Sequence, residues 1–362
     1  TPLYLNKTWG ANFHPFRTGN LLEVNPHTGE VWAGTLGDGL WRYAGQEWIK
    51  IASVPDGRFS RNAEGGNLAE GTIAICFDVT DARYVYVAVR GYGVYRSSDG
   101  GQTFVDTGRL PEDLYDLSLS SDGGTLFAAV NEKGIFRLSD CRTARDWKNV
   151  SFAAVDMRVR TVTCSPHEKN TVISANGQYN CLNEIYISKD NGESWRCIPG
   201  KARSIVPWHP AGYPGSAISQ FAFDPCDSLR VYFTDWYSFY KTDNITADTV
   251  IWDNRMAAGH EEMVPVTMAA NLVPNRQQVS LYVGGADLSA IQITDPDRFS
   301  ELPNIGSLSG SRLFQEVSGI DCFGEDPNIV AFCGGEGWEM KKGGLGITYD
   351  GGQTLRICKG YD

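Results

Sequence analysis

Three octapeptides in the chain share one pattern. Each has a hydroxyl residue at position 1, Asp at position 3, Gly at position 5, a second hydroxyl residue at position 7 and an apolar residue at position 8. They are SSDGGQTF at 97–104, SKDNGESW at 188–195 and TYDGGQTL at 348–355. Aspartate in such a turn accepts hydrogen bonds from backbone N–H groups, and glycine supplies the positive φ that tight turns need. This pattern, the Asp box, predicts a hairpin turn whose final apolar side chain is buried, and it constrains the fold more than the function.

The boxes lie within a longer phrase that is repeated along the whole chain. The phrase reads as an apolar run, a Gly-rich turn, an apolar run ending in an aromatic, a polar turn and a short strand, and its copies start 41 to 59 residues apart. This period is typical of a four-stranded propeller blade. The seven copies start at Val31, Tyr84, Thr125, Thr171, Arg230, Ser280 and Ile329.

We label the strands of each blade A to D in chain order, so that the phrase covers strands B to D. Apolar residues in these runs alternate with a period of two, and no segment carries a sustained helical stripe. The sequence predicts an all-β chain, a seven-bladed β-propeller with four-stranded antiparallel blades and Asp-box turns, formed by residues 1–362 as a single domain. A similar octapeptide, SSDGGTLF at 120–127, falls between strands A and B, and we expect an ordinary Asp-Gly turn there.

Composition narrows the class of partner. The chain has 32 basic and 43 acidic residues and a net charge of −11, which argues against nucleic acid or an anionic membrane surface. No apolar run approaches the roughly 18 to 20 residues that span a bilayer, so no membrane insertion is expected. The triplets at 6–8, 149–151 and 244–246 fit the N-glycosylation acceptor pattern and favour an extracellular or cell-surface glycoprotein.

The spacing of cysteine and histidine predicts no metal site and no cofactor. The chain contains nine cysteines and five histidines, without a Cys-x-x-Cys pair or another zinc-like spacing. A structural calcium ion held by Asp-rich turns is kept as an option, although no ligand spacing supports it.

A functional site is expected on the face where the B–C turns and the D–A connections gather around the propeller axis, opposite to the Asp boxes. Aromatic rings can stack on sugars, and carboxylates can accept bonds from sugar hydroxyls, so an oligosaccharide or polysaccharide fits this face best. The candidate catalytic carboxylates are Asp38, Asp235, Asp287 and Glu336. The candidate substrate-binding residues are Arg90, Tyr92, Trp208, His209, Tyr213, Trp236, Tyr237 and Trp338.

Each candidate has a structural alternative. An Asp beside Gly is common turn chemistry, and Trp and Tyr side chains also pack within or between blades. As functional groups, two carboxylates about 5 to 9.5 Å apart would supply the acid and the base for glycoside hydrolysis. His209, in a loop rich in Pro and Gly, is the best general-base candidate among the histidines.

Two longer passages resemble glycoside hydrolase family 74, the xyloglucanases. VWAGTLGDGLWR at 31–42 is similar to the first-blade motif of that family, and AGHEE at 258–262 followed by LYVGGADL at 281–288 is similar to a second pair of its motifs. The resemblance implies a polysaccharide substrate and a cleft between two propellers, each of which supplies one carboxylate. The position that matches the family's first-blade catalytic Asp is Leu36, with Asp38 two residues further on.

Three functions follow as alternatives. The first is a secreted glycoside hydrolase acting on a plant-type or microbial glycan, with Asp38 or Asp287 as the base and Asp235 or Glu336 as the acid. The second is a polysaccharide lyase on the same fold, using His209 and Tyr213 with Arg90 or Arg158 to neutralise a uronate carboxylate. The third is a non-catalytic carbohydrate-binding or adhesion propeller. Under the first alternative the chain can be one half of a larger two-propeller protein.

Overall fold

The computed structural model divides the chain into two compact units. The first unit is Thr1–Arg203 with Gly212–Met256, and the second is Ser204–Ala211 with Ala257–Asp362. Each unit is described below by itself. The structure describes residues 22–35, 37–63, 66–153, 157–177, 184–203, 218, 220–235, 239–255, 264–271, 280–286, 289–293, 316–323, 326, 328–335 and 343–358.

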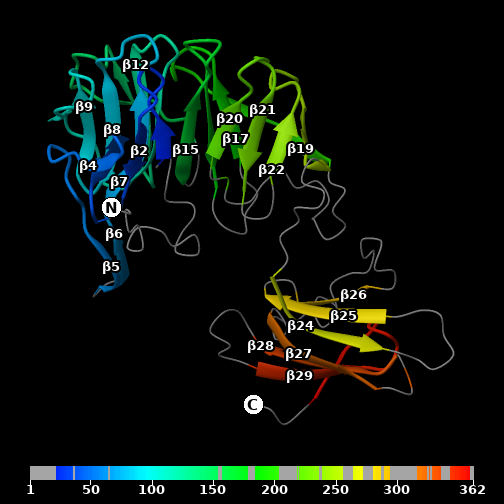
Figure 1. Cartoon of the computed structure of the whole chain (residues 1–362). Coiled ribbons are helices and arrows are strands. Elements are labelled where there is room, and N and C mark those ends of the chain that lie inside the picture. The colour runs from blue at the N-terminus through cyan, green and yellow to red at the C-terminus, as the bar shows by residue number, and fades with distance from the viewer. Residues whose placement is uncertain are drawn as a thin grey trace. The chain divides into compact units, whose positions relative to one another are not determined.

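Among its described residues, the first unit contains one two-stranded hairpin and five larger sheets, which are numbered 1 to 5 in chain order (Figure 1). Sheets 1 to 4 each have four antiparallel strands, in which every strand pairs with the next along the chain. Sheet 1 is β1 (Leu22–Val24), β2 (Val31–Gly34), β3 (Leu40–Ala44) and β4 (Glu47–Lys50). Sheet 2 is β7 (Gly71–Phe77), β8 (Val85–Arg90), β9 (Gly93–Ser97) and β10 (Val105–Asp106). Sheet 3 is β11 (Leu114–Leu119), β12 (Thr125–Val130), β13 (Gly134–Ser139) and β14 (Lys148–Asn149).

Sheets 4 and 5 complete the first unit. Sheet 4 is β15 (Val159–Cys164), β16 (Val172–Asn176), β17 (Glu184–Ser188) and β18 (Arg196–Ile198). Sheet 5 is β20 (Gln220–Phe223), β21 (Val231–Thr234), β22 (Phe239–Thr242) and β23 (Val250–Asp253), with β19 (Gly200–Arg203) added in parallel beside β23. A separate hairpin, β5 (Phe59–Ala63) and β6 (Gly66–Ala69), extends beyond the ends of the neighbouring strands (Figure 1).

The second unit contains sheets 6 and 7. Sheet 6 has three strands among the described residues, β24 (Val264–Asn271), β25 (Ser280–Ala286) and β26 (Ser289–Ile293). Sheet 7 has four, β27 (Glu316–Cys322), β28 (Val330–Gly335), β29 (Gly343–Thr348) and β30 (Arg356–Ile357). These pairings are antiparallel as well.

The sequence prediction of an all-β chain built from repeated antiparallel sheets is confirmed. The seven repeated phrases begin at strand B of the seven sheets, or one residue before it. Within the described ranges no α-helix occurs, and so none is long and apolar enough to cross a membrane. Closure into one seven-bladed ring within a single domain stays a prediction.

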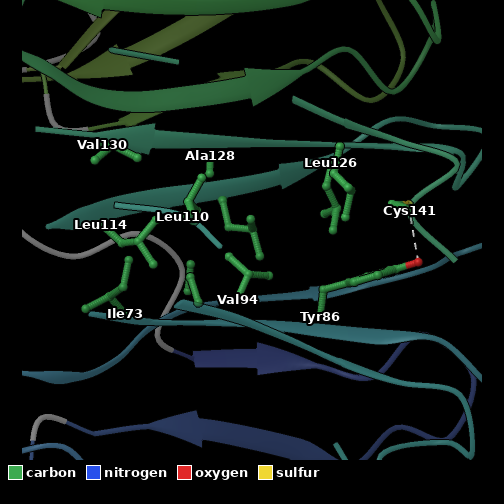
Figure 2. Packing of buried hydrophobic residues seen from close by; sticks show 13 residues of the cluster. Ile73, Tyr86, Val94, Leu110, Leu114, Leu126, Ala128, Val130 and Cys141 are labelled. Atoms are coloured by element: carbon green, nitrogen blue, oxygen red, sulfur yellow. Dashed lines mark hydrogen bonds between the residues drawn. The ribbon is translucent and has the colours of Figure 1, made fainter. Parts of the chain in front are cut away.

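Consecutive sheets pack face to face through apolar side chains. Figure 2 shows the core between sheets 2 and 3, where Ile73 and Val94 from one sheet meet Leu114 and Leu126 from the other. All four side chains are fully buried, and such burial contributes roughly 1.5 to 3 kcal/mol for each large side chain. Similar clusters lie between sheets 1 and 2, 3 and 4, 4 and 5, and 6 and 7.

The three Asp boxes connect strands C and D of sheets 2, 4 and 7, and each satisfies its own polar groups. In the first box, Ser97 donates to Asp99 at 2.7 Å and accepts from the Gly101 amide at 2.8 Å, while Asp99 accepts from the Thr103 amide at 2.9 Å. The other two boxes repeat these three bonds. The box aspartates are therefore fully occupied by the turn, as the pattern predicted.

Each box also contacts the preceding sheet through its apolar residue. Phe104 is buried in the core between sheets 1 and 2, with its ring centroid 6.4 Å from that of Trp32. Trp195 donates its indole N–H to the Val150 carbonyl at 2.6 Å, beside the core of sheets 3 and 4. Leu355 packs against the core of sheets 6 and 7. The octapeptide at 120–127 instead joins β11 to β12, which confirms the expected Asp-Gly turn.

Candidate functional site

In the first unit, the B–C turns and the D–A connections meet at the same end of the sheets, as predicted. The Gly91 amide in the B–C turn of sheet 2 donates to the Glu112 carbonyl in the following D–A connection at 2.9 Å. Equivalent backbone bonds join Gly39 to Asp56, Asn131 to Asp113 and Gly177 to Arg158. This end of the first unit, the B–C face, carries the described candidate residues. An open pocket of about 400 Å³ lies at this face, lined by Arg109, Leu110, Pro111 and Glu112.

Asp38 lies in the B–C turn of sheet 1 and is held by a lysine. Its carboxylate is 3.3 Å from Lys50 Nζ, which also lies 2.9 Å from Asp56, and its carbonyl accepts from the Trp41 indole at 2.8 Å. Partial burial lowers the pKa of Lys50, but the bonds to Asp56 and Asp38 outweigh this, so the pKa lies above its ordinary value. Asp38 therefore sits in a turn where it shares the charge of Lys50 with Asp56.

Arg90, at the end of β8, is buried and held by its own fold. Its Nε donates to the Leu114 carbonyl at 2.7 Å, and it lies 3.6 Å from the Asp113 carboxylate. Its guanidinium also stacks 4.7 Å from the centroid of the Tyr115 ring. Only 5% of Arg90 is exposed. These contacts tie sheet 2 to the start of sheet 3 and leave little of the guanidinium for a bound molecule.

Tyr92, two residues away, has the opposite character because 41% of it is exposed. The turn that carries it is fixed by a bond from the Tyr92 amide to the Val89 carbonyl at 3.0 Å. The neighbouring Gly91 lies against Glu70, whose carboxylate pairs with Arg58 through two bonds of 2.7 Å. An aromatic ring thus stands exposed beside an ion pair that is already neutralised.

The other predicted site residues are mostly outside the described residues. Asp235 follows β21 directly, at the start of the B–C turn of sheet 5, and is half-buried. Asp38 and Arg90 bond to separate partners, Asp38 to Lys50 and Arg90 to the start of sheet 3. The candidates that lie outside the described residues are Trp208, His209, Tyr213, Trp236, Tyr237, Asp287, Glu336 and Trp338.

Sequence reasoning did not identify Glu184, a further carboxylate on the B–C face. It begins β17, directly after the B–C connection of sheet 4, and is exposed. Its Oε2 accepts a bond from the Tyr186 hydroxyl at 2.9 Å and a longer one from Asn176 Nδ2 at 3.5 Å. The Glu-x-Tyr spacing, which places both side chains on one side of a strand, was the available signal.

A group of three or more carboxylate, histidine or cysteine side chains suited to a metal is not found among the described residues.

Comparisons with known proteins place this geometry in context. No family model matches the chain. A xyloglucanase from Paenibacillus sp. is 25% identical over an alignment 433 residues long, covering 95% of this chain and 39% of that protein. Xyloglucanase Xgh74A from Acetivibrio thermocellus is 23% identical, covering 96% of this chain and 48% of that protein. The chain thus spans less than half the length of these curated relatives.

Solved structures show the fold. The GH74 xyloglucanase from Xanthomonas campestris matches 94% of this chain and 52% of its own chain, with a TM-score of 0.76 and 22% identity. The GH74 enzyme of Niastella koreensis matches 95% of this chain and 50% of its own, with a TM-score of 0.73 and 18% identity. The chain is therefore a β-propeller like those of glycoside hydrolase family 74, as the sequence motifs indicated.

Proposed function

We propose that this chain is the polysaccharide-active propeller of a secreted glycoside hydrolase that acts on a neutral plant glycan of the xyloglucan type. The observation that carries the proposal is the similarity of about 95% of the chain to two xyloglucanases. The B–C face supports it, because it carries an exposed aromatic ring, Tyr92, and an exposed carboxylate, Glu184, that can accept bonds from sugar hydroxyls.

Three cations of the B–C face are already paired with carboxylates, which favours a neutral sugar over a uronate at these positions. Lys50 pairs with Asp38 and Asp56, Arg58 with Glu70, and Arg90 with Asp113. A lyase needs a cation that is available to neutralise the uronate carboxylate, and Arg90 is buried and bonded to the protein instead. We therefore rank the hydrolase above the lyase.

Hydrolysis would use two carboxylates, one as an acid and one as a base. Asp38 would have to give up its ion pair with Lys50 to accept a proton, so Asp287 is the preferred base. Asp235 and Glu336 remain the candidates for the acid, and a second propeller outside this chain is a further source of one carboxylate. A structural calcium ion is not required by this mechanism.

Incubation with xyloglucan and with a uronate-containing gum tests the proposal. Hydrolysis gives new reducing ends from xyloglucan, whereas a lyase gives an unsaturated sugar that absorbs in the ultraviolet. Asp287→Ala should abolish release of reducing ends, and unchanged turnover would remove Asp287 from the mechanism. Neither product from either polymer, and no binding to xyloglucan, would refute the proposal.

One observation favours non-catalytic binding as a second candidate. Leu36 stands at the position that matches the family's first-blade catalytic Asp, and the nearby Asp38 is paired with Lys50. Binding of xyloglucan without new reducing ends, by this chain and by the protein extended with a second propeller, would select this function.

A further inference from the structure

We infer that Glu184 is a substrate-binding residue of the B–C face, where its carboxylate accepts hydrogen bonds from hydroxyl groups of the bound glycan. The inference rests on the proposed function and adds to it a residue of sheet 4. Four observations support it, namely the register position of Glu184, its hydrogen bonds, its anchoring and its charge environment.

Sheet 4 differs from sheets 2 and 3 in its residues at one equivalent pair of positions. The last B–C pair of sheet 2 is Val89 with Gly93, and that of sheet 3 is Val130 with Gly134. The corresponding pair in sheet 4 is Asn176 with Glu184. A buried valine and a glycine without a side chain are thus both replaced by polar residues.

The buried amide that replaces the valine needs hydrogen-bond partners, and Glu184 is one of them. Asn176 is only 8% exposed, and a buried amide costs stability unless its bonds are satisfied. Both polar atoms of the Asn176 side chain form hydrogen bonds. Its Oδ1 accepts from the Arg158 backbone N–H at 2.7 Å, and its Nδ2 donates to Glu184 Oε2 at 3.5 Å. The buried amide therefore links the D–A connection to the Glu184 carboxylate.

The bonds to Glu184 fix one oxygen and leave the other available. The Tyr186 hydroxyl and the Asn176 amide both donate to Oε2. Among the described residues, no donor bonds Oε1. A carboxylate oxygen can accept two bonds, so Oε1 can take one or two sugar hydroxyls while Oε2 keeps the side chain oriented.

Tyr186 provides a rigid support for this orientation. Its ring is 7% exposed and stacks on Phe152, with centroids 3.8 Å apart and planes inclined by 3°. A side chain held by such packing loses little further freedom when a ligand binds, and this favours affinity. Glu184 is therefore positioned before the glycan arrives.

The charge environment of Glu184 differs from that of four other carboxylates on the B–C face. Asp38, Asp56, Glu70 and Asp113 each lie within ion-pairing distance of a lysine or an arginine. In the part of the chain that the structure describes, Glu184 has no such cation, and its partners are a phenol and an amide. A glycan hydroxyl can therefore bond to Glu184 without displacing an ion pair.

Titration calorimetry with xyloglucan oligosaccharides on the full chain tests the inference. Glu184→Gln keeps the shape of the side chain but replaces a charged acceptor with a neutral one, and we expect affinity to fall roughly tenfold, since hydrogen bonds to a carboxylate are stronger than those to an amide. Tyr186→Phe should weaken binding in the Glu184 protein and cause no further loss in the Glu184→Gln protein, as expected for a positioning residue.

Glu193→Gln is the control at the opposite end of the same sheet, where the exposed Glu193 carboxylate lies in the Asp-box turn and pairs with Arg137. Its affinity should equal that of the wild type. Equal affinity of the Glu184→Gln protein and the wild type would overturn the inference and leave the proposed function intact. If the wild type binds no xyloglucan, the proposed function fails, and this inference fails with it.

A labelling experiment on the wild-type protein avoids the question of whether a variant folds. A water-soluble carbodiimide with an amine should modify the exposed Glu184 carboxylate, and bound xyloglucan oligosaccharide should reduce modification of Glu184 but not of Glu193. Equal modification of Glu184 with and without a saturating ligand would contradict the inference.

Discussion

Arg142 bonds to the completely buried carboxylate of Asp78, which lies in the turn between β7 and β8. Nε and Nη2 of Arg142 lie 2.9 Å and 2.7 Å from Asp78 Oδ2, and Thr80 donates its hydroxyl to Oδ1 at 2.7 Å. Arg142 follows β13, so this ion pair joins sheet 2 to sheet 3 at the end opposite to the B–C face.

Arg142→Ala should destabilise the protein by about 2 to 4 kcal/mol, because it leaves a buried carboxylate without its cation. The partial exposure of Arg142 keeps the expected loss below that of a fully buried pair. Denaturant unfolding measures the change. The double variant Asp78→Asn/Arg142→Ala should regain part of the stability, and a double variant less stable than Arg142→Ala would disprove the explanation.

Gly101→Ala should cost more stability than Gly100→Ala. Both glycines have positive φ, of 85° and 72°. A Cβ on Gly101 would lie 2.2 Å from the Trp32 ring, whereas the nearest atom to a Cβ on Gly100 is 3.8 Å away. Gly100→Ala should cost about 1 kcal/mol for its φ, and Gly101→Ala about 1 to 3 kcal/mol more for overpacking. Equal losses in thermal unfolding would show that the box does not press on Trp32.

Asp116 should make the stability fall as the pH rises from about 4 to about 7. It is 4% exposed, and burial raises its pKa to about 7 against the opposing bonds from Val162, Leu117 and Thr161. The folded state then holds a proton that the unfolded state has released above its ordinary value of 3.8, so this contribution is complete below pH 4 and lost through pH 7. Unfolding measured against pH should show this slope, and Asp116→Asn should flatten it.

The Asp boxes act in a separate and lower pH window. Bonds from Thr103 lower the pKa of Asp99 to about 2, and bonds from Thr354 do the same for Asp350. Their contribution is present above about pH 4 and is lost as the pH falls towards 2. A slope between pH 4 and 7 that survives Asp116→Asn would assign that slope to another group.

Tyr92 and Arg90 should separate binding from stability. Tyr92→Ala removes an exposed ring, so we expect roughly a two- to tenfold loss of affinity for xyloglucan oligosaccharides from lost stacking and little change in unfolding. Arg90→Ala removes a buried group bonded to Leu114 and should cost about 1 to 3 kcal/mol of stability. Calorimetry and denaturant unfolding check the two effects. Unchanged affinity in Tyr92→Ala would remove that ring from the site.

Features set by local chemistry could be predicted from the sequence. Each Asp box needs only its own eight residues for its bonds, and the alternation in segments such as 85–90 reports which residues face a core. The Asp-box pattern and the alternation of apolar residues together predicted where strand B of each sheet begins. The sharing of one end by the B–C turns and the D–A connections followed from the topology.

Features that depend on distant pairing could not be predicted. The hairpin of β5 and β6 pairs only with itself, and β19 joins sheet 5 as a parallel strand with the sequence GKAR, so neither carries an alternating apolar pattern. Glu184 was missed because the connection between it and its register partner Asn176 is long and covers residues 177–183. The matching turns of sheets 2 and 3 cover only residues 90–92 and 131–133.

The docking of each Asp box onto the preceding sheet has a consequence for biosynthesis. The surfaces that receive Phe104, Trp195 and Leu355 are all supplied in part by residues earlier in the chain. Synthesis proceeds from the N-terminus, so each Asp box emerges from the ribosome after the part of the preceding sheet that its apolar residue will contact. Each contact between an Asp box and the preceding sheet can therefore form before the rest of the chain is synthesised. This limits the time for which the apolar face of a sheet is exposed to other nascent proteins.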